Sequence, residues 1–361
     1  MQGEKIREYY NHSIETTQRA ELRELQTKLL KYQIKYVFNF SRIEHRKFLD
    51  AGVSEETVKT LDDLKKVPII RKDEIKEEIG KTNDPFGGTM CIPEDASCVI
   101  IELFDEIPPQ TDPLYQVLTK NDCTNMIEMF ARYCSMIGMK RGDRMITQGA
   151  VDFTETYVHP LTSECIFFSP TVSKIFKSLS LGLTDVMPRA MGPAVDGVKS
   201  FNFIKFFKPA VLFITPELLK HMAVLAEAEG ISPRDMGVKI IVYPDHNELL
   251  KPSMRKELME LWDANVFSML CVPEVGFHAI DCREFVGLHV WEDMFIVEAV
   301  EASSDEPVSP GETGKLTITN LFAKGNPFIR YKTNIDVELK EDPCACGRSH
   351  IRLLSQNYKE G

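Results

Sequence analysis

The sequence has no excess of positive charge. Its 361 residues include 43 Lys and Arg against 54 Asp and Glu, a formal net charge of −11. A nucleic-acid binder is expected to carry a basic field, so nucleic acid is excluded as the main class of partner. We interpret the acidic balance as an aid to solubility.

Long apolar runs and an export signal are also lacking. No apolar run is long enough to cross a bilayer, and the first residues, Met1 to Tyr10, are charged. We therefore expect neither a membrane partner nor a secretory signal. Nine cysteines are scattered along the chain. Without an export signal, they favour free thiols in a reducing cytoplasm over a disulfide framework.

The first part of the chain has a helical pattern. Apolar residues recur at helical spacing over 22–38, which predicts one long amphipathic helix. Ser41 and Glu44 form a capping-box pattern ahead of a second helix, and Ser54 is placed to begin a third. Pro68 ends this helical part, because proline cannot continue a helix.

From about residue 98 short β-rich runs alternate with helical stretches. A helix is predicted from Thr215 and Pro216 to near Gly230. This alternation predicts an α/β fold with a largely parallel sheet. The predicted strands of this part are Cys98–Phe104, Cys165–Ser169, Val211–Ile214 and Lys239–Tyr243.

After about residue 285 the helical patterns nearly vanish. The predicted strands are Met294–Val300, Lys315–Leu321, Phe328–Lys332 and Ile335–Leu339. We therefore divide the chain into three parts: a helical part at 1–97 packed on the body, an α/β body at 98–284, and a β-rich lobe at 285–361.

Two clusters near the C-terminus carry candidate metal ligands. Cys282 and His289 form the first cluster, and Cys344 and Cys346 form the second, with Gly347 after it. Three thiolates and one imidazole are a common ligand set for structural zinc, and four ligands leave no open position for catalysis. The alternative is two unrelated thiol patches and a surface histidine. Exposed neighbouring thiols are a liability without a metal, which favours the zinc site.

A series of motifs in the same order resembles the phenylacetate–coenzyme A ligases of the adenylate-forming superfamily. The segments are Gly287-Leu288-His289, Pro310-Gly311-Glu312-Thr313-Gly314, Pro327 to Thr333, and Cys344-Ala345-Cys346-Gly347-Arg348. The resemblance implies a zinc ion held by the four matched Cys and His residues. It also implies a large domain of layered α/β sheets with a smaller barrel-like lobe. A mobile C-terminal domain follows in the family, and because this chain ends at Gly361 we expect that domain to be absent.

The nucleotide-binding positions of the family differ in this chain. The expected phosphate loop at 104–113 has no glycine, and its prolines remove N–H donors that would bind phosphate. Glu274 matches the magnesium position. Ile335 stands where the ribose-binding aspartate is expected, and Asp336 follows it, so Glu274 and Asp336 are the remnant nucleotide positions. We expect binding of ATP and Mg²⁺ to be lost or rebuilt.

A small-molecule pocket is expected to remain. By resemblance, its lining includes Phe153, Tyr157, Tyr243 and His278. Candidates for acid–base chemistry are Glu274, His246 and His159. The alternative is a polar rim without catalysis.

These observations leave two functional hypotheses open. In the first, the protein has eroded nucleotide motifs, lacks ATP-dependent ligase activity and keeps a pocket for an aryl or acyl carboxylate or a thioester. In the second, it is an active acyl-CoA ligase or acyl-adenylate-forming enzyme that works with a separate partner domain. A homodimer or a partner protein is compatible with either hypothesis.

Overall fold

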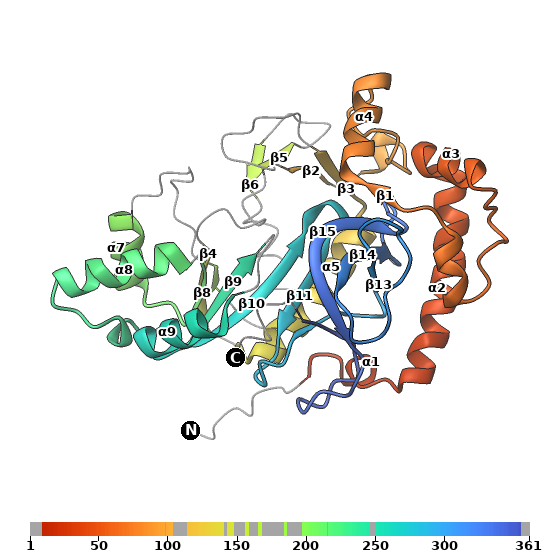
Figure 1. Ribbon diagram of the computed structural model, residues 1–361. Coiled ribbons are helices and arrows are strands. Elements are labelled where there is room, and N and C mark those ends of the chain that lie inside the picture. The colour runs from red at the N-terminus through yellow and green to blue at the C-terminus, as the bar shows by residue number, and fades with distance from the viewer. Residues whose placement is uncertain are drawn as a thin grey trace.

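The computed structural model describes residues 9–97, 99–103, 114–140, 143–147, 156–158, 165–167, 184–185, 197–214, 216–245 and 250–354. Their helices and strands form two sheets with helices packed around them (Figure 1). Among these residues, no helix is both long and apolar enough to cross a membrane.

The N-terminal elements are mostly helical and lie together at one side of the molecule (Figure 1). The predicted long helix is confirmed as α2. Ser41 caps α3, where its Oγ accepts from Glu44 N at 3.4 Å. The helix predicted at Ser54 is wrong. Thr57 N instead donates to Ser54 O at 3.1 Å, which closes a turn. The elements are α1 (His12–Glu15), α2 (Arg19–Phe40), α3 (Arg42–Asp50), η1 (Leu61–Lys66), β1 (Ile70–Arg71), α4 (Lys72–Thr82) and η2 (Glu94–Ala96).

The larger sheet has twelve strands, and their pairing changes from antiparallel to parallel along its width. Its order is β13-β14-β15-β16-β12-β11-β10-β9-β8-β4-β7, with β1 paired to β15. Neighbours from β10 to β7 are parallel, and neighbours from β13 to β10 are antiparallel. The strands are β4 (Arg144–Thr147), β7 (Thr184–Asp185), β8 (Val211–Phe213), β9 (Ile240–Asp245), β10 (Asn265–Val272), β11 (Phe277–Asp281), β12 (Leu288–His289), β13 (Phe295–Val300), β14 (Gly314–Asn320), β15 (Tyr331–Lys340) and β16 (Arg352–Leu354).

The prediction of a largely parallel sheet therefore holds only for one half of this sheet. The two first predicted strands lie in a separate four-stranded antiparallel sheet of order β3-β2-β5-β6. Only ten residues separate β2 from β3, too short a connection for a helical crossover between parallel strands. These strands are β2 (Val99–Leu103), β3 (Leu114–Leu118), β5 (Thr156–Val158) and β6 (Cys165–Phe167).

A second difference concerns β15. Two strands are predicted there, at Phe328–Lys332 and Ile335–Leu339, but the structure has one strand, Tyr331–Lys340. The register with β14 shifts between Lys315, which is opposite Asp336, and Thr317, which is opposite Lys332, so β15 bulges and holds the extra residues between the two predicted runs.

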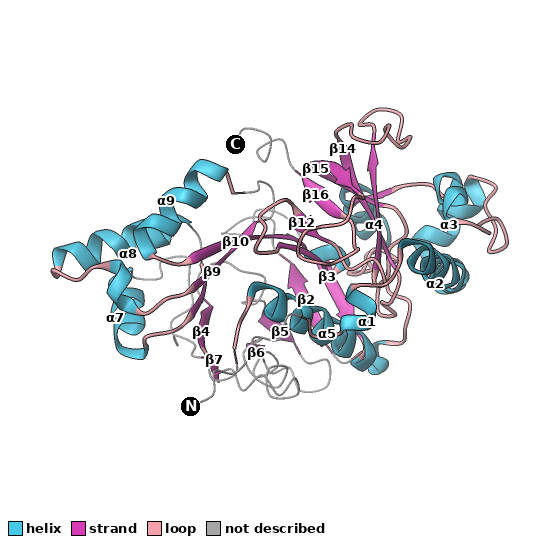
Figure 2. Cartoon of the chain, turned by 90° about the horizontal axis from the view of Figure 1, so that it is seen from below, coloured by secondary structure: helices cyan, strands magenta, loops and turns pink. Residues whose placement is uncertain are grey.

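The parallel half of the large sheet is covered on both faces. Val211 and Phe213 of β8 belong to one apolar core, and Leu212 and Ile214 belong to another, because successive side chains point to opposite faces. The first core includes residues of α5 (Lys120–Ile137). The second is covered by helices that lie along one side of the strands (Figure 2). These are α7 (Gly197–Phe207), α8 (Pro216–Ala228), η4 (Pro233–Met236) and α9 (Pro252–Trp262).

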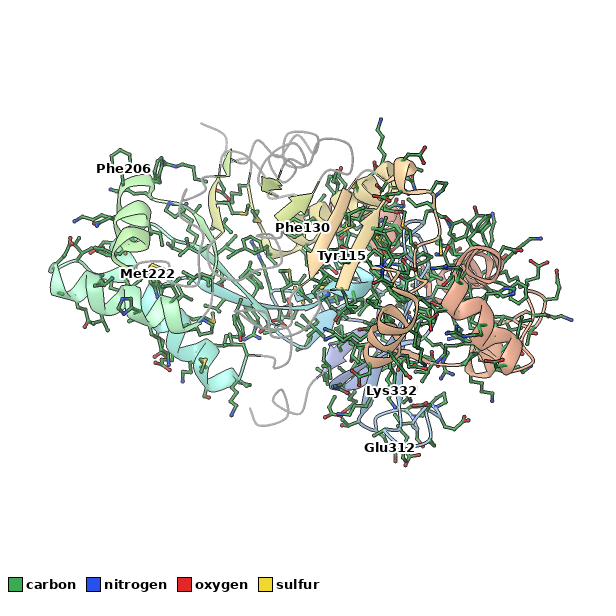
Figure 3. All side chains as sticks on the ribbon, turned by 90° about the horizontal axis from the view of Figure 1, so that it is seen from above. Tyr115, Phe130, Phe206, Met222, Glu312 and Lys332 are labelled. Carbon is green, nitrogen blue, oxygen red and sulfur yellow. The ribbon has the colours of Figure 1, made fainter. Side chains whose placement is uncertain are left out.

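A third core joins the N-terminal helices to the antiparallel end of the sheet. Leu30, Ile34 and Val37 of α2 pack with Ile296 of β13 and with Ile329. The division into 1–97, 98–284 and 285–361 stays a prediction. At the opposite end of the molecule, Phe206 on α7 is 80% exposed and points away from the body (Figure 3).

Candidate functional site

The four predicted metal ligands converge in the antiparallel half of the large sheet. Cys282 directly follows β11, His289 ends β12, and Cys344 and Cys346 lie in the loop between β15 and β16. One donor atom from each residue lies within 4.8 Å of all the others. Three of the residues are buried and Cys346 is half-buried. The structure therefore builds a Cys/His cluster that could bind a metal.

The distances within the cluster fit a tetrahedral metal. Cys282 Sγ lies 3.7 Å from Cys344 Sγ, and Cys346 Sγ lies 3.5 Å from His289 Nε2. Around a tetrahedral zinc with Zn–S of about 2.3 Å and Zn–N of about 2.05 Å, two sulfurs lie about 3.8 Å apart and a sulfur and a nitrogen about 3.6 Å apart. The donor set is also the one that zinc prefers. The residues present thus fit a zinc ion.

The protonation of the three thiols is uneven. Hydrogen bonds from Cys282 and then Cys344 lower the pKa of the Cys346 thiol, and His289 adds to this effect. The pKa of Cys282 is raised, first by its hydrogen bond to Cys344. A thiolate is the form that binds metals, and thiols packed this closely share their protons, so a cation that replaces those protons is favoured at the cluster.

The turn that carries the two C-terminal cysteines depends on a glycine. Gly347 has φ of 86°, a conformation that L side chains rarely adopt, and its N–H donates to Cys344 O at 2.9 Å. Cys344 N in turn donates to Arg348 O at 3.3 Å. The Cys-x-Cys-Gly pattern is therefore the local sequence that turns both thiols toward one point.

Glu274, the predicted magnesium position, is engaged in a salt bridge. It lies in η5 (Pro273–Val275), just after β10, and its Oε1 is 2.7 Å from Lys72 Nζ at the start of α4. The side chains are 12% and 31% exposed, respectively. Sequence reasoning missed Lys72, because the two residues are 202 positions apart and no motif links them.

Glu274 also lines a small pocket. The cavity volume is about 10 Å³, enough for about one water molecule. Apart from Glu274 and Thr89 its wall is apolar and aromatic, and Tyr115 lies near the centre of the molecule (Figure 3). The lining residues are Ile75, Pro85, Phe86, Thr89, Leu103, Leu114, Tyr115, Glu274 and Phe328.

Asp336, the second remnant nucleotide position, lies in the middle of β15 with its side chain partly exposed to solvent. Its side chain is 49% exposed and its Oδ1 is 2.9 Å from Lys315 Nζ. Its backbone is paired opposite Lys315 on β14. The neighbouring Ile335 packs against the main core instead.

The remaining predicted pocket residues are distributed over several elements. Tyr243 lies on β9 and packs against the core under α7, α8 and α9. His278 is buried on β11, paired opposite Cys271 on β10. Tyr157 lies on β5. Phe153, His159 and His246 lie outside the described residues.

Comparison with curated proteins finds phenylacetate–coenzyme A ligases. The chain is 26% identical over 349 residues to that of Thermus thermophilus, covering 95% of this chain and 72% of the other. It is 23% identical to that of Pseudomonas putida, covering 89% and 67%, and 26% identical to that of Escherichia coli, covering 89% and 68%. No protein-family model matches the chain.

Solved structures agree on the fold. An open conformation of a 2-hydroxyisobutyryl-CoA ligase in complex with 2-HIB-AMP and CoA has a TM-score of 0.81 at 20% identity, covering 96% of this chain and 76% of the other. The same ligase in its thioesterification state has a TM-score of 0.82. The expected layered α/β architecture of the adenylate-forming ligases is thereby confirmed.

Proposed function

We propose that this homologue of the phenylacetate–coenzyme A ligases binds an organic acid or its thioester but has lost ATP-dependent activation of that acid. One observation carries the proposal. Lys72 Nζ lies 2.7 Å from the carboxylate of Glu274, which matches the magnesium position of the family. Mg²⁺ is usually held by one or two carboxylates together with substrate phosphates, and an ammonium group already neutralises this carboxylate.

Two further positions support the loss of nucleotide binding. The segment 104–113 contains Pro108, Pro109 and three acidic residues but no glycine, a composition unsuited to a loop of converging N–H groups around phosphate. Asp336 is paired with Lys315 and half exposed, as in an ordinary surface ion pair.

The ligand class rests on the similarity to the phenylacetate–coenzyme A ligases, and not on the pocket beside Glu274. Phe86, Tyr115 and Phe328 give that pocket an aromatic and apolar wall, but its volume of about 10 Å³ holds about one water molecule. An organic acid or thioester needs a wider site than this pocket.

We also infer that the Cys/His cluster binds a structural zinc ion. All four positions of a tetrahedral ion are filled by protein donors, which leaves none for a substrate. A reducing compartment such as the cytoplasm suits this site, because its thiols stay reduced there and available to the metal.

A melting screen tests the loss of nucleotide binding. The ligands are ATP and AMP, each with Mg²⁺, coenzyme A, acyl-CoAs and aryl acids. A ligand at about 100 times its dissociation constant stabilises the folded state by roughly 2.7 kcal/mol, which shifts the melting temperature measurably. We expect a shift with an acid or a thioester and none with Mg-ATP. A clear shift with Mg-ATP would overturn the proposal.

The second candidate is an active carboxylate-activating enzyme that works with a separate domain. Similarity to the ligases extends over 89–95% of the chain, and the glutamate at the magnesium position is present. This candidate predicts exchange of labelled pyrophosphate into ATP when a suitable aryl or acyl acid is added. The first candidate predicts no exchange above background with any acid in the panel.

A further inference from the structure

The N-terminal residues 9–17, here called the strap, lie against the turn that carries two of the candidate metal ligands. His350 Nε2 is 2.9 Å from Ile14 O, and Ser349 Oγ donates to Thr17 O at 2.6 Å. The residues that bind the strap directly follow Cys346 in sequence. We call 344–350 the knuckle.

A buried ion pair fixes the centre of the strap to the knuckle. Arg348 Nε donates to Glu15 Oε2 at 2.8 Å, and the two side chains are 3% and 0% exposed. The other carboxylate oxygen, Glu15 Oε1, accepts from the backbone N–H groups of Tyr10 and Asn11 at 2.9 and 2.8 Å. Separating the two partners of a buried pair leaves an uncompensated charge. The ion pair therefore favours the arrangement in which the strap is docked on the knuckle.

Tyr9 lies directly over the glycine of the knuckle. Its hydroxyl donates to Cys346 O at 3.1 Å, and its ring lies 4.7 Å from the Arg348 guanidinium. A Cβ atom at Gly347 would come within 2.2 Å of the Tyr9 hydroxyl oxygen. Glycine thus meets two needs at position 347: it adopts the left-handed conformation of the turn, and its lack of a side chain leaves the space that Tyr9 occupies.

We propose that the strap is a lid on the metal centre, so that strap docking slows metal release and metal loss weakens strap docking. This inference rests on the metal site proposed above. Strap and metal stabilise the same conformation of 344–350, and coupling between two such events is reciprocal. The strap therefore acts as an outer shell that orients Cys346 through its backbone carbonyl and through the next two residues.

Transfer of zinc from the full-length loaded protein to a chromophoric chelator tests the first half of the proposal. Glu15→Gln removes the charge that pairs with Arg348, and we expect transfer to be about 10-fold faster or more. Glu78→Gln is the matched control. Glu78 is also largely buried and paired with an arginine, Arg46 at 2.7 Å, but it contacts α3 rather than the knuckle. Its transfer rate should stay within about twofold of the unchanged protein.

A milder variant covers the case in which Glu15→Gln does not fold. Tyr9→Phe removes the hydroxyl that donates to Cys346 O and keeps the ring, and we expect about threefold faster transfer. Tyr32→Phe is its control, because Tyr32 is 59% exposed on α2.

Hydrogen exchange measured by mass spectrometry tests the second half of the proposal, that metal loss weakens docking of the strap. Peptides covering 9–17 should exchange faster after chelation, and peptides of α9 should not.

The outcomes separate this proposal from the metal site itself. Wild-type protein purified without chelator and found free of metal would overturn the metal site, and the lid with it. Stoichiometric metal together with unchanged transfer in both strap variants would overturn the lid alone. Equal hydrogen-exchange rates of residues 9–17 with and without metal would also overturn the lid alone.

Discussion

The Cys/His cluster and the two remnant nucleotide positions, Glu274 and Asp336, hold their ionisable groups in different ways. In the cluster, three sulfurs and one imidazole converge within 4.8 Å. At the remnant nucleotide positions, Glu274 and Asp336 face Lys72 and Lys315 at 2.7 and 2.9 Å. Converging donors are stabilised by a cation, whereas a carboxylate already paired with lysine gains less from one. The Cys/His cluster is therefore suited to bind a metal ion, whereas Glu274 and Asp336 are each already paired with a lysine.

The largest expected effect lies at the knuckle. Cys344→Ser removes one of four donors from a buried cluster, so we expect loss of the bound metal and a fall in the free energy of unfolding of about 4 kcal/mol or more. Metal analysis and urea unfolding measure the two effects.

Cys123→Ser is the control for this change, because Cys123 is a half-buried cysteine on α5 outside the cluster. It should keep its metal. If Cys344→Ser retains one equivalent of metal and its stability, the contrast between the Cys/His cluster and the remnant nucleotide positions disappears.

A third carboxylate sharpens the comparison, because Glu44 is buried without a lysine or arginine in a salt bridge among the described residues. It is 2% exposed, and only its Oε1 has a hydrogen-bond donor, Ile329 N at 3.3 Å. Burial raises the pKa of Glu44 from 4.5 to about 8. Between these values the folded protein holds a proton that the unfolded chain has lost, so stability falls as the pH rises through this window.

Glu44→Gln keeps the shape of the side chain and removes its ionisation. At pH 8 we expect the variant to be more stable than the unchanged protein by about 4 kcal/mol, with little difference at pH 4.5. Urea unfolding at both pH values measures this. Equal stability of the two proteins across the whole range would show that Glu44 ionises without cost in the fold.

The sequence predicts those features that depend on neighbouring residues. Val211–Phe213 is a short apolar run and forms a buried strand, and the helical spacing over 22–38 forms α2. The four candidate ligands could be named because closely spaced Cys and His residues next to a glycine, as in Cys344-Ala345-Cys346-Gly347, are typical of zinc sites. Whether they bind zinc stays a prediction.

Features that depend on distant pairing could not be predicted in this way. The sequence does not state that β2 pairs with β3 rather than with a parallel neighbour. The contacts of Lys72 with Glu274 and of Glu15 with Arg348 span 202 and 333 positions. Ser54 has the residue type of a helix N-cap, but Ser54 N donates to Thr57 Oγ1 at 2.8 Å and a turn forms.

The smallest expected effect is at Asp336. If its contact with Lys315 is an ordinary surface ion pair, Asp336→Asn changes the free energy of unfolding by less than about 1 kcal/mol and leaves the response to Mg-ATP unchanged. Asp342→Asn is the matched control, since Asp342 is 67% exposed and pairs with Arg352 at 2.7 Å. Melting of both variants with and without Mg-ATP measures the difference. If only Asp336→Asn abolishes a stabilisation by Mg-ATP, Asp336 binds nucleotide, and the remnant nucleotide positions form a binding site as the Cys/His cluster is proposed to do.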